Sequence, residues 1–600
     1  MAKPLELKTE STNPQSIITN HIDIWASAIE QKSSAGRGTS NKFSLYGIKK
    51  LRELILELAV RGKLVPQDAN DEPASVLLDR IATEKAQLVK EGKLKKQKPL
   101  PELGDDEKPF ELPNGWVWVR LNEAAEYNGR PNLDPNNITG NTWLLDLEDI
   151  EKDSSRLLYK AVYSERESKS NKSTFQKGDV LYGKLRPYLN KVIIADDDGV
   201  CTTEIVPIVP NEAVNAEYLK YLLKSPSFLN YVNSLMYGVK MPRLGTDDAI
   251  KSIHPIAPLK EQLRIVAKVD ELMSLCDALE AQTEASISAH QTLVETLLKS
   301  LIADTSGKTA MDGGNVENAG AIFDRIAEHF DTLFTTEASI DTLKQTILQL
   351  AVMGKLVSQD KNEEPAAKLL KRIAKEKAQL ISDGKIKKQK PLQAIIDEEK
   401  PFELPKGWEW DKCQNICFKI TDGEHATPER AESGHYLLSA RNVTNEGIIL
   451  NDVDYVPTHE FNRIRKRCDP NIGDILISCS GSIGRVALVD RDNTYCMVRS
   501  AAMIRPCNEN LSPLFLAIML RSPYLQDQMS ARSKQLAQAN LFLGAIGNLV
   551  AVIPPLEEQK RIVAKVDELM TLCDQLKSCL SDTQTTKLNL TDAILVQAVS

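Results

Sequence analysis

The sequence predicts a mixed α/β protein in which one unit occurs twice in tandem, with pseudo-twofold symmetry. The first observation is a duplicated segment, EQLRIVAKVDELMSLCD at 261–277 and EQKRIVAKVDELMTLCD at 558–574, in which two positions differ. The second is a block, 51–116, that matches 343–408 without a gap. Patterns of short strands and helices alternate between these shared blocks. We therefore expect two similar frames that carry two different α/β inserts.

The length and composition are those of an intracellular globular protein. The chain has 600 residues, 42% of them hydrophobic and 26% charged, which is ordinary for a folded protein. Its ten cysteines are scattered, and Cys276 and Cys573 take equivalent places on the duplicated segment. This pattern, with neither a signal-peptide core nor an apolar run of membrane-spanning length, predicts reduced thiols and a cytoplasmic location.

The net charge argues against one class of nucleic-acid binder. At a formal value of -8, the chain cannot be coated uniformly with positive charge. Local basic faces remain compatible with this value, because binding depends on the field at the contact surface.

In chain order, residues 1–44 are expected to be an N-terminal tail and residues 45–110 a first shared helical region. Apolar residues at helical spacing predict a helix that ends near Gly62, and Pro73 suits the first turn of a second helix. A second shared helical region at 322–402 repeats this pattern.

Each second helix runs into a basic strip, GKLKKQKPL at 92–100 and GKIKKQKPL at 384–392. One interpretation is a solvated hinge, because charge runs usually face water. The other is a contact with phosphate or with a partner that both units share. The sequence leaves both interpretations open.

The inserts, 111–258 and 403–555, are each expected to form one α/β domain. Residues 178–195 alternate apolar and polar side chains around a basic turn, which predicts two strands and a loop. Residues 473–489 occupy the same place in the second insert, with a loop rich in Ser and Gly. The two inserts are therefore expected to share one fold although their sequences differ.

Helices complete the predicted architecture. One short helix is expected in each insert, at 218–232 and at 514–529. Each insert then leads into a long helix, 259–303 or 556–600. The first of these is apolar at its two ends and polar in its middle, which suits packing on a partner helix at both ends. The intervening 304–321 has the composition of a linker.

Motifs for catalysis and nucleotide binding are missing. A methyltransferase loop of the type Asn/Asp-Pro-Pro-aromatic is excluded, because the sole Pro-Pro pair is Pro554-Pro555 with Leu556 after it. The SGKT sequence at 306–309 imitates a phosphate loop, but Ile302 stands where its first glycine is required. No catalytic residue and no cofactor are expected on this chain.

The sequence suggests one conceivable metal centre, a zinc site. It would use Cys413, Cys417, His425 and His435. No second Cys pair supports it, so core cysteines are the preferred interpretation. We therefore expect no metal.

Basic residues gather at one place in both inserts. Between residues 163 and 191 there are seven basic and three acidic residues, and between 458 and 485 five and three. Lys and Arg beside Ser, Asn and Gly suit phosphate contact and groove reading. Basic surface loops are common, but their recurrence in two diverged inserts favours nucleic-acid contact.

In their order these features resemble the specificity (S) subunit of type I restriction-modification enzymes. The resemblance is carried by LRELILELAVRGKLVPQD, KPFELPNGW, a GDVL strand with a basic loop and PLKEQLRIVAKVDELM, all of which return in the second unit. It covers nearly the whole chain beyond the tail. It implies two target recognition domains, each reading half of a split DNA site. It also implies long helices that form an antiparallel coiled coil and set the gap between half-sites.

The resemblance also implies partners. The S subunit of that family docks two methyltransferase subunits, which bind S-adenosylmethionine and methylate adenine. Restriction subunits supply ATP-driven translocation and cleavage, and the S subunit itself has no catalysis. For this chain, the implied ligand is double-stranded DNA with a bipartite, asymmetric target.

Candidate DNA contacts are chosen by their position in the loops, since recognition residues vary within this family. In the first insert they are Lys184, Arg186, Lys191, Lys240 and Arg243. In the second insert they are His425, Arg441, Ser480, Ser482 and Arg485.

Two functions from other classes remain open on sequence grounds. The first is an enzyme in its own right, such as a nuclease-methyltransferase fusion, which methyl transfer by the purified chain would reveal. The second is a coiled-coil adaptor that binds protein, which uniformly acidic inserts would favour.

Overall fold

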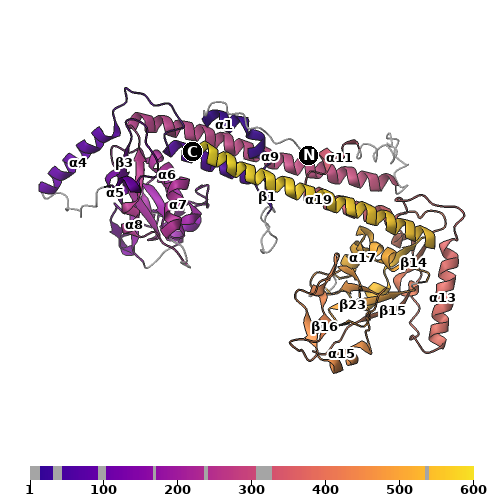
Figure 1. The fold of residues 1–600 in the computed structure, drawn as a ribbon. Helices are drawn as coiled ribbons and strands as arrows, with labels where there is room; N and C mark the ends of the chain where they lie inside the picture. The colour runs from indigo at the N-terminus through magenta and orange to yellow at the C-terminus, as the bar shows by residue number, and fades with distance from the viewer. Residues whose placement is uncertain are drawn as a thin grey trace. The chain divides into compact units, whose positions relative to one another are not determined.

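Two compact units make up the chain in the computed structural model (Figure 1). Unit 1 comprises Met1–Ala285 with Thr583–Ser600, and unit 2 comprises Ser286–Asp582. The residues that the structure describes are 14–31, 43–91, 103–166, 170–235, 241–305, 328–507, 509–533 and 540–599.

Both long helices contribute to both units. Helix α9 (Leu259–Thr305) begins in unit 1 and ends in unit 2, whereas α19 (Leu556–Val599) begins in unit 2 and ends in unit 1. They pass through the units in opposite order, as expected of an antiparallel pair. In the described ranges, no helix combines the length and the apolar character needed to cross a membrane.

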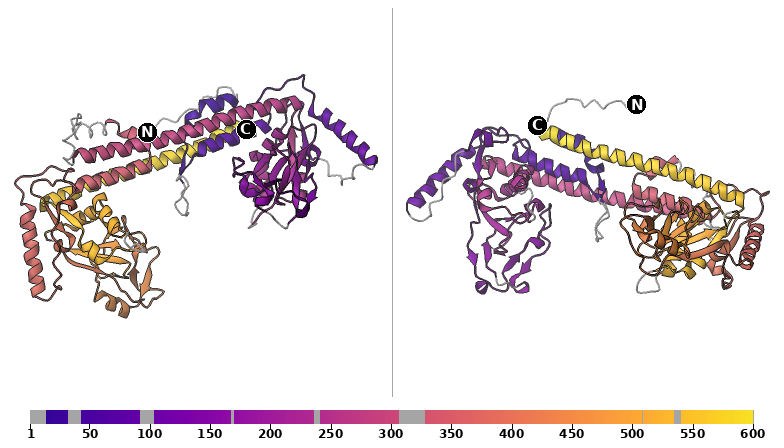
Figure 2. Two further views of the ribbon diagram at one scale, coloured as in Figure 1. Left: turned by 180° about the vertical axis from the view of Figure 1, so that it is seen from behind. Right: turned by 60° about the horizontal axis from the view of Figure 1, so that its bottom comes forward.

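The frame of unit 1 is helical. Its elements are α1 (Pro14–Asn20), α2 (Ile22–Ser27), α3 (Tyr46–Val60) and α4 (Ala74–Lys90), with a short pair of strands, β1 (Glu30–Gln31) and β2 (Phe43–Ser44). Helix α3 buries Leu54, Ile55 and Leu58, and α2 buries Trp25. The last part of α19 lies beside α3 (Figure 2), where Tyr46 donates to Asp592. The predicted stop at Gly62 is confirmed by its left-handed φ of 65°.

The frame of unit 2 repeats this arrangement with α11 (Phe330–Leu333), α12 (Glu337–Val352) and α13 (Ala366–Ser382). One hydrophobic cluster joins the end of α9, α12 and the start of α19 through Leu298, Ile347 and Ile562. Most of the predicted linker, 306–321, lies outside the described residues, as does the first basic strip at 92–100.

Equivalent contacts occur within each of the two frames. In unit 1, Arg52 forms an ion pair with Asp277 at 2.6 Å, and Lys344 pairs with Asp574 at the same place in unit 2. The amide of Gln67 donates to Glu261 at 3.1 Å, and the same bond joins Gln359 and Glu558. The segments that recur in the sequence therefore make equivalent contacts in both units.

The first insert contains two main sheets. One is antiparallel, in the order β10-β9-β12-β4 (Val192–Ile194, Val180–Gly183, Ile205–Pro210, Ala125–Tyr127). The other runs β5-β8-β11-β6-β7 (Asn132–Leu133, Lys172–Phe175, Gly199–Cys201, Trp143–Leu145, Ala161–Val162), in which β6 and β11 are parallel. A further pair, β3 (Val117–Arg120) and β13 (Ile253–Ile256), joins the ends of the insert. Its helices are α5 (Leu121–Ala124), α6 (Ala216–Lys224), α7 (Pro226–Leu235) and α8 (Thr246–Lys251).

The second insert has the same plan. Its antiparallel sheet is β15-β23-β20-β21 (Cys417–Asp422, Ala501–Pro506, Ile475–Ser478, Val486–Leu488). Beside it are β19-β16-β22 (Asp454–Val456, His435–Leu438, Tyr495–Met497), the hairpin β17-β18 (Val443–Thr444, Gly447–Ile448) and the end pair β14-β24 (Glu409–Lys412, Val550–Ile553). Its helices are α14 (Cys413–Ile416), α15 (Thr458–Arg465), α16 (Pro513–Arg521), α17 (Pro523–Ser533) and α18 (Leu543–Gly547).

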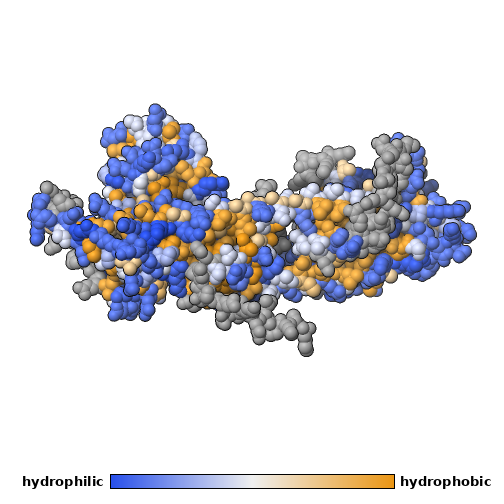
Figure 3. Space-filling view, turned by 90° about the horizontal axis from the view of Figure 1, so that it is seen from above, coloured by the Kyte–Doolittle hydropathy of each residue, from blue (hydrophilic) through white to orange (hydrophobic). Residues whose placement is uncertain are grey.

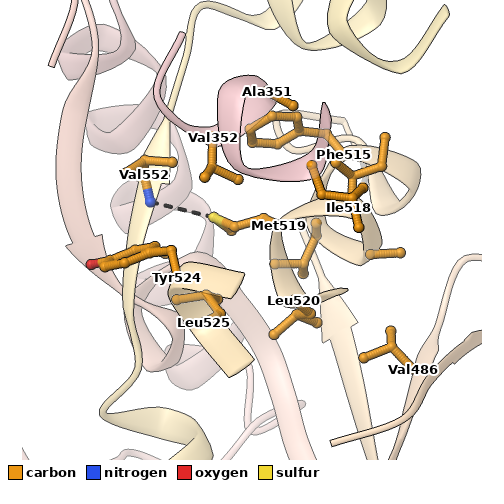
Figure 4. Packing of buried hydrophobic residues seen from close by; sticks show 14 of the residues in the cluster. Ala351, Val352, Val486, Phe515, Ile518, Met519, Leu520, Tyr524, Leu525 and Val552 are labelled. Carbon is orange, nitrogen blue, oxygen red and sulfur yellow. Dashed lines mark hydrogen bonds between the residues drawn. The ribbon is translucent and has the colours of Figure 1, made fainter. Parts of the chain in front are cut away.

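Helix α16 connects the second insert to its frame. Its Phe515, Ile518 and Met519 pack beside Ala351 and Val352 of α12 (Figure 4). This apolar contact fixes the insert on the frame of its own unit.

The prediction of one helix at 218–232 and one at 514–529 was wrong, because each is two helices. Ser225 and Ser522 interrupt them with extended backbone, at ψ of 150° and 148°. Proline follows both serines, and the residue before proline disfavours the helical conformation. Each serine hydroxyl also donates to the carbonyl three residues earlier, at 2.7 Å and 2.6 Å.

Candidate nucleic-acid interface

The predicted strand-loop-strand of the first insert is confirmed as β9 and β10, and its loop is held by two other segments. The amide of Lys184 donates to the carbonyl of Glu204 at 3.0 Å, and its own carbonyl accepts from Leu244 N at 3.0 Å. Two residues later, Arg186 N donates to the carbonyl of Pro242 at 2.8 Å. Three segments distant in sequence therefore meet at one junction.

The second insert builds the same junction from different side chains. Cys479 N donates to the carbonyl of Ser500 at 2.8 Å, and Leu541 N donates to the carbonyl of Cys479 at 2.9 Å. An isolated backbone bridge adds Ser480 and Asn540. Since these are main-chain bonds, the junction is preserved while its side chains differ.

One backbone conformation of this junction is also shared. Arg186 has a φ of 50° and Gly481, at the equivalent position, a φ of 70°. The left-handed region costs a residue with a Cβ atom about 1 kcal/mol or more. The first insert therefore keeps an arginine where glycine would be less strained, and such strain is typical of binding sites.

Three of the predicted residues of the first insert meet at its junction. The backbone of Arg243 pairs with Leu185, and its guanidinium lies 3.0 Å from the carboxylate of Glu204. The side chains of Lys184 and Arg186 make no hydrogen bond or ion pair with any residue that the structure describes, and Arg186 is exposed. These two cations are available to a ligand.

Two further predicted residues of this insert are placed differently. Lys191 is half-buried, and its ammonium donates to the carbonyl of Leu147 at 2.7 Å. Burial lowers the pKa of this ammonium. Lys240 lies outside the described residues.

Hydrogen bonds of Ser500 and the adjacent Arg499 join four loops of the second insert into one cluster, the Ser500 hub. Besides its bond from Cys479, its hydroxyl accepts from Ala440 N at 3.0 Å. The preceding residue, Arg499, donates its amide to the carbonyl of Glu424 at 3.0 Å. Directly after the anchored residues Glu424, Ala440 and Cys479 come three of the predicted residues, His425, Arg441 and Ser480. The structure thus brings together residues that span more than fifty positions of sequence.

Carboxylates engage some of these side chains. His425 Nε2 lies 2.8 Å from Asp422, a carboxylate that Arg467 also contacts. Arg441 lies 3.0 Å from Asp454. Both predicted residues remain exposed, so a ligand could exchange with these pairings.

The loop from Ser478 to Arg485 carries the remaining two predicted residues. The carbonyl of Arg485 accepts from Ser478 N at 3.0 Å, which closes the loop. Ser482 is exposed at its tip. The Arg485 side chain is exposed and has no bonding partner in the part of the chain that the structure describes.

Sequence reasoning missed Arg499. This arginine lies beside the Ser500 hub, is exposed, and makes no side-chain hydrogen bond or ion pair within the described ranges. It lies outside the basic clusters at 163–191 and 458–485. The VRS sequence around it gives no signal that it lies at the junction, because strand order alone brings it there.

Several of the clustered basic residues have structural roles instead. Arg166 pairs with Asp149 at 2.9 Å. Arg465 donates to the carbonyl of Tyr495 at 2.7 Å. Local charge counted along the sequence therefore overstated the free positive charge of these loops.

The four residues of the conceivable zinc site do not form a metal-binding cluster. Cys413 and Cys417 are fully buried as free thiols, and burial raises the pKa of Cys413 to about 12. His435 stacks on Phe461 at 4.0 Å between ring centroids. Within the described ranges, no cluster of three or more His, Cys, Asp or Glu side chains could hold a metal ion.

Comparison with known proteins gives a family for this arrangement. A model described as "Type I restriction modification DNA specificity domain" matches residues 113–289 and 405–582. The chain belongs to this family. Each of the two matched segments of this specificity protein contains one complete junction.

Two relatives that match this chain along their whole length support the same family. The type I restriction enzyme EcoAI specificity subunit of Escherichia coli is 42% identical, with 98% of this chain and 100% of that protein covered. The EcoEI specificity subunit of Escherichia coli is 40% identical, with the same coverage. A crystal structure of the HsdS subunit from Thermoanaerobacter tengcongensis is 21% identical, covers 82% of this chain and 98% of that chain, and has a TM-score of 0.40.

Proposed function

We propose that this chain is the DNA-recognition subunit of a type I restriction-modification complex. It reads a bipartite, asymmetric target in double-stranded DNA, one half with each insert, and has no catalysis of its own. The junction at Lys184 and Cys479 carries this proposal, because one backbone scaffold presents different side chains in the two inserts. Different side chains on the same scaffold read different base sequences.

The proposed contacts have two roles. Arg186, Arg485 and Arg499 are exposed and unpaired within the described ranges, and an arginine can bond guanine bidentately. Lys184, Ser480 and Ser482 suit phosphates or single base edges. The candidates with carboxylate partners, Arg243, His425 and Arg441, contact DNA by exchanging those partners. Lys191, which directly precedes β10, and Lys240, which lies outside the described residues, are the other proposed contacts of the first insert.

The proposed protein partners are two methyltransferase subunits, and restriction subunits join through them. Two near-identical frames offer one kind of partner two equivalent docking places. Leu275 and Leu572 are equivalent and are 59% and 53% exposed, and Figure 3 shows hydrophobic residues exposed among hydrophilic ones on the face it draws. We place the complex in the cytoplasm, where its buried cysteines stay reduced.

The test is to co-express the chain with its methyltransferase subunit and map adenine methylation across the genome. A split motif methylated on both strands is expected. Replacing residues 117–254 with those of a relative should change one half of the motif, and replacing 409–551 should change the other half. A complex that forms but methylates no defined motif would contradict the proposal.

A further inference from the structure

Helix α13 carries a lysine face. Lys368, Lys371 and Lys375 follow one another at helical spacings of three and four residues, so they lie on one side of the helix. All three are exposed, and none of their ammonium groups has a hydrogen bond or ion pair with another residue that the structure describes. A charged face without carboxylate partners is open to a polyanion.

The opposite face of α13 is fixed to the second insert. Leu369 and Ile373 are buried. One turn after Ile373 on the same face, the Lys377 ammonium donates to the carbonyl of Cys417 at 2.9 Å and to that of Gln414. In Figures 1 and 2 the helix lies along one side of this insert, within unit 2. Its lysine face therefore has a defined orientation on unit 2.

The basic strip continues this surface. After α13, Lys385 N donates to the carbonyl of Leu380 at 2.9 Å, and Gln414 donates to the carbonyl of Lys390 at 3.0 Å. Between these anchors Lys387 and Lys388 are exposed. From residue 366 to residue 390 the sequence has nine basic and two acidic residues. The backbone of the strip is therefore held at both ends and continues the basic surface of the helix.

The first unit has no such helical face. Its α4 has Val76, Asp79 and Thr83 at the equivalent positions, and all three are exposed. The two frames are otherwise close copies. This difference in charge therefore distinguishes the second unit from the first.

We propose that Lys368, Lys371, Lys375, Lys387, Lys388 and Lys390, the α13 lysine surface, bind the phosphates of DNA that flanks the half-site read by the second insert. This inference rests on the proposed function. Lysines provide sequence-independent phosphate contacts. The helical lysines extend over about 10 Å, which corresponds to about three phosphates of one strand. None of the exposed large hydrophobic side chains of the described residues lies between residues 366 and 390, which disfavours an apolar partner or a membrane.

The experiment uses the complex with its methyltransferase subunits and measures binding to target DNA at several salt concentrations. One DNA has long flanks, and two others are cut short on one side or the other. Wild type should bind more weakly when the flank next to the half-site of the second insert is removed, and the insert exchange described above identifies that side. The variant Lys368→Gln/Lys371→Gln/Lys375→Gln should lose this difference. Its slope of log K against log salt should be shallower by about 2 to 3.

Two matched variants separate this contact from total charge. Lys251→Gln/Lys355→Gln/Lys406→Gln removes the same charge from exposed positions elsewhere and should keep the flank dependence. Val76→Lys/Asp79→Lys/Thr83→Lys places the lysine face on α4 and should create dependence on the opposite flank. If the α13 variant keeps the wild-type slope and flank dependence while target and non-target DNA are still distinguished, the inference is overturned and the proposed function stands. If the wild-type complex does not distinguish target from non-target DNA, both the proposed function and this inference fail.

Discussion

The amide of Cys479 donates to the carbonyl of Ser500 at 2.8 Å and joins two loops that are distant in sequence. The first insert has the same bond at 3.0 Å, although its residues, Lys184 and Glu204, have quite different side chains. Main-chain atoms make both bonds, so the side chains can vary without loss of the junction. A recognition protein that must change its target while keeping its fold requires this separation.

Removing the free arginines of the second insert should weaken DNA binding. We expect Arg485→Ala and Arg499→Ala each to lose about 1 to 3 kcal/mol of binding free energy to the target, with relaxed specificity at one base pair if the contact is to a base. Competition binding with single-base variants of the target measures this. Arg491→Ala is the control, because Arg491 is exposed and pairs with Asp490 away from the Ser500 hub. Equal affinity of all three variants would refute the assigned interface.

Truncation of Glu57 should destabilise unit 1. The buried carboxylate of Glu57 accepts from the hydroxyl of Ser227 at 2.6 Å and from Arg61 at 2.8 Å. We expect Glu57→Ala to lower the free energy of unfolding by about 2 kcal/mol, because it leaves these donors unpaired. Chemical denaturation followed by circular dichroism measures the loss.

Glu57→Gln is the matched control for that prediction. Gln349 occupies the equivalent position and accepts from Tyr524 N at 3.0 Å. An amide at position 57 should therefore retain part of the contact and cost less than alanine. A glutamine variant as unstable as the alanine variant would contradict this account.

Two glycines of unit 2 should respond differently to alanine. Gly354 and Gly384 both have left-handed φ values, 67° and 70°. A Cβ at Gly354 would lie 2.4 Å from Pro405 Cγ, whereas one at Gly384 would meet nothing within 4 Å. Gly384→Ala should cost about 1 kcal/mol of conformational strain, and Gly354→Ala distinctly more. Thermal unfolding compares the two, and equal losses would rule out the steric contribution.

Stability should fall in mildly acidic solution because of His254. Burial lowers the pKa of this imidazole from 6.5 to about 4. Below pH 6.5 the imidazole of His254 binds a proton in the unfolded chain but not in the folded chain. The free energy of unfolding therefore decreases as the pH falls from 6.5 towards 4. The whole loss would be about 3 kcal/mol.

Denaturation midpoints measured across that pH range test the prediction. His254→Ala introduces the residue found at the equivalent position, Ala551, and should flatten the dependence on pH. An unchanged pH profile would assign the acid sensitivity to other groups.

The frame was accessible to sequence reasoning because its signals are local or repeated. Gly62 and Pro73 marked helix boundaries that the structure places at Val60 and Ala74. The break at Ser225 was missed, because apolar spacing on both sides of it suggested one continuous helix. The proline after Ser225 disfavours the helical conformation of that serine, and the bond from its hydroxyl to the carbonyl of Leu222 ends the first helix there.

The sequence by itself determined the two-unit organisation, the α/β inserts and the family, because near-identical segments must make near-identical contacts. Only the tertiary structure decided which cations are free. Arg463 and Arg467 pair with Glu424 and Asp422, whereas Arg485 and Arg499 have no partner among the described residues. The physical reason is that ion pairs depend on distance in space, and strand order sets that distance for residues far apart in the chain.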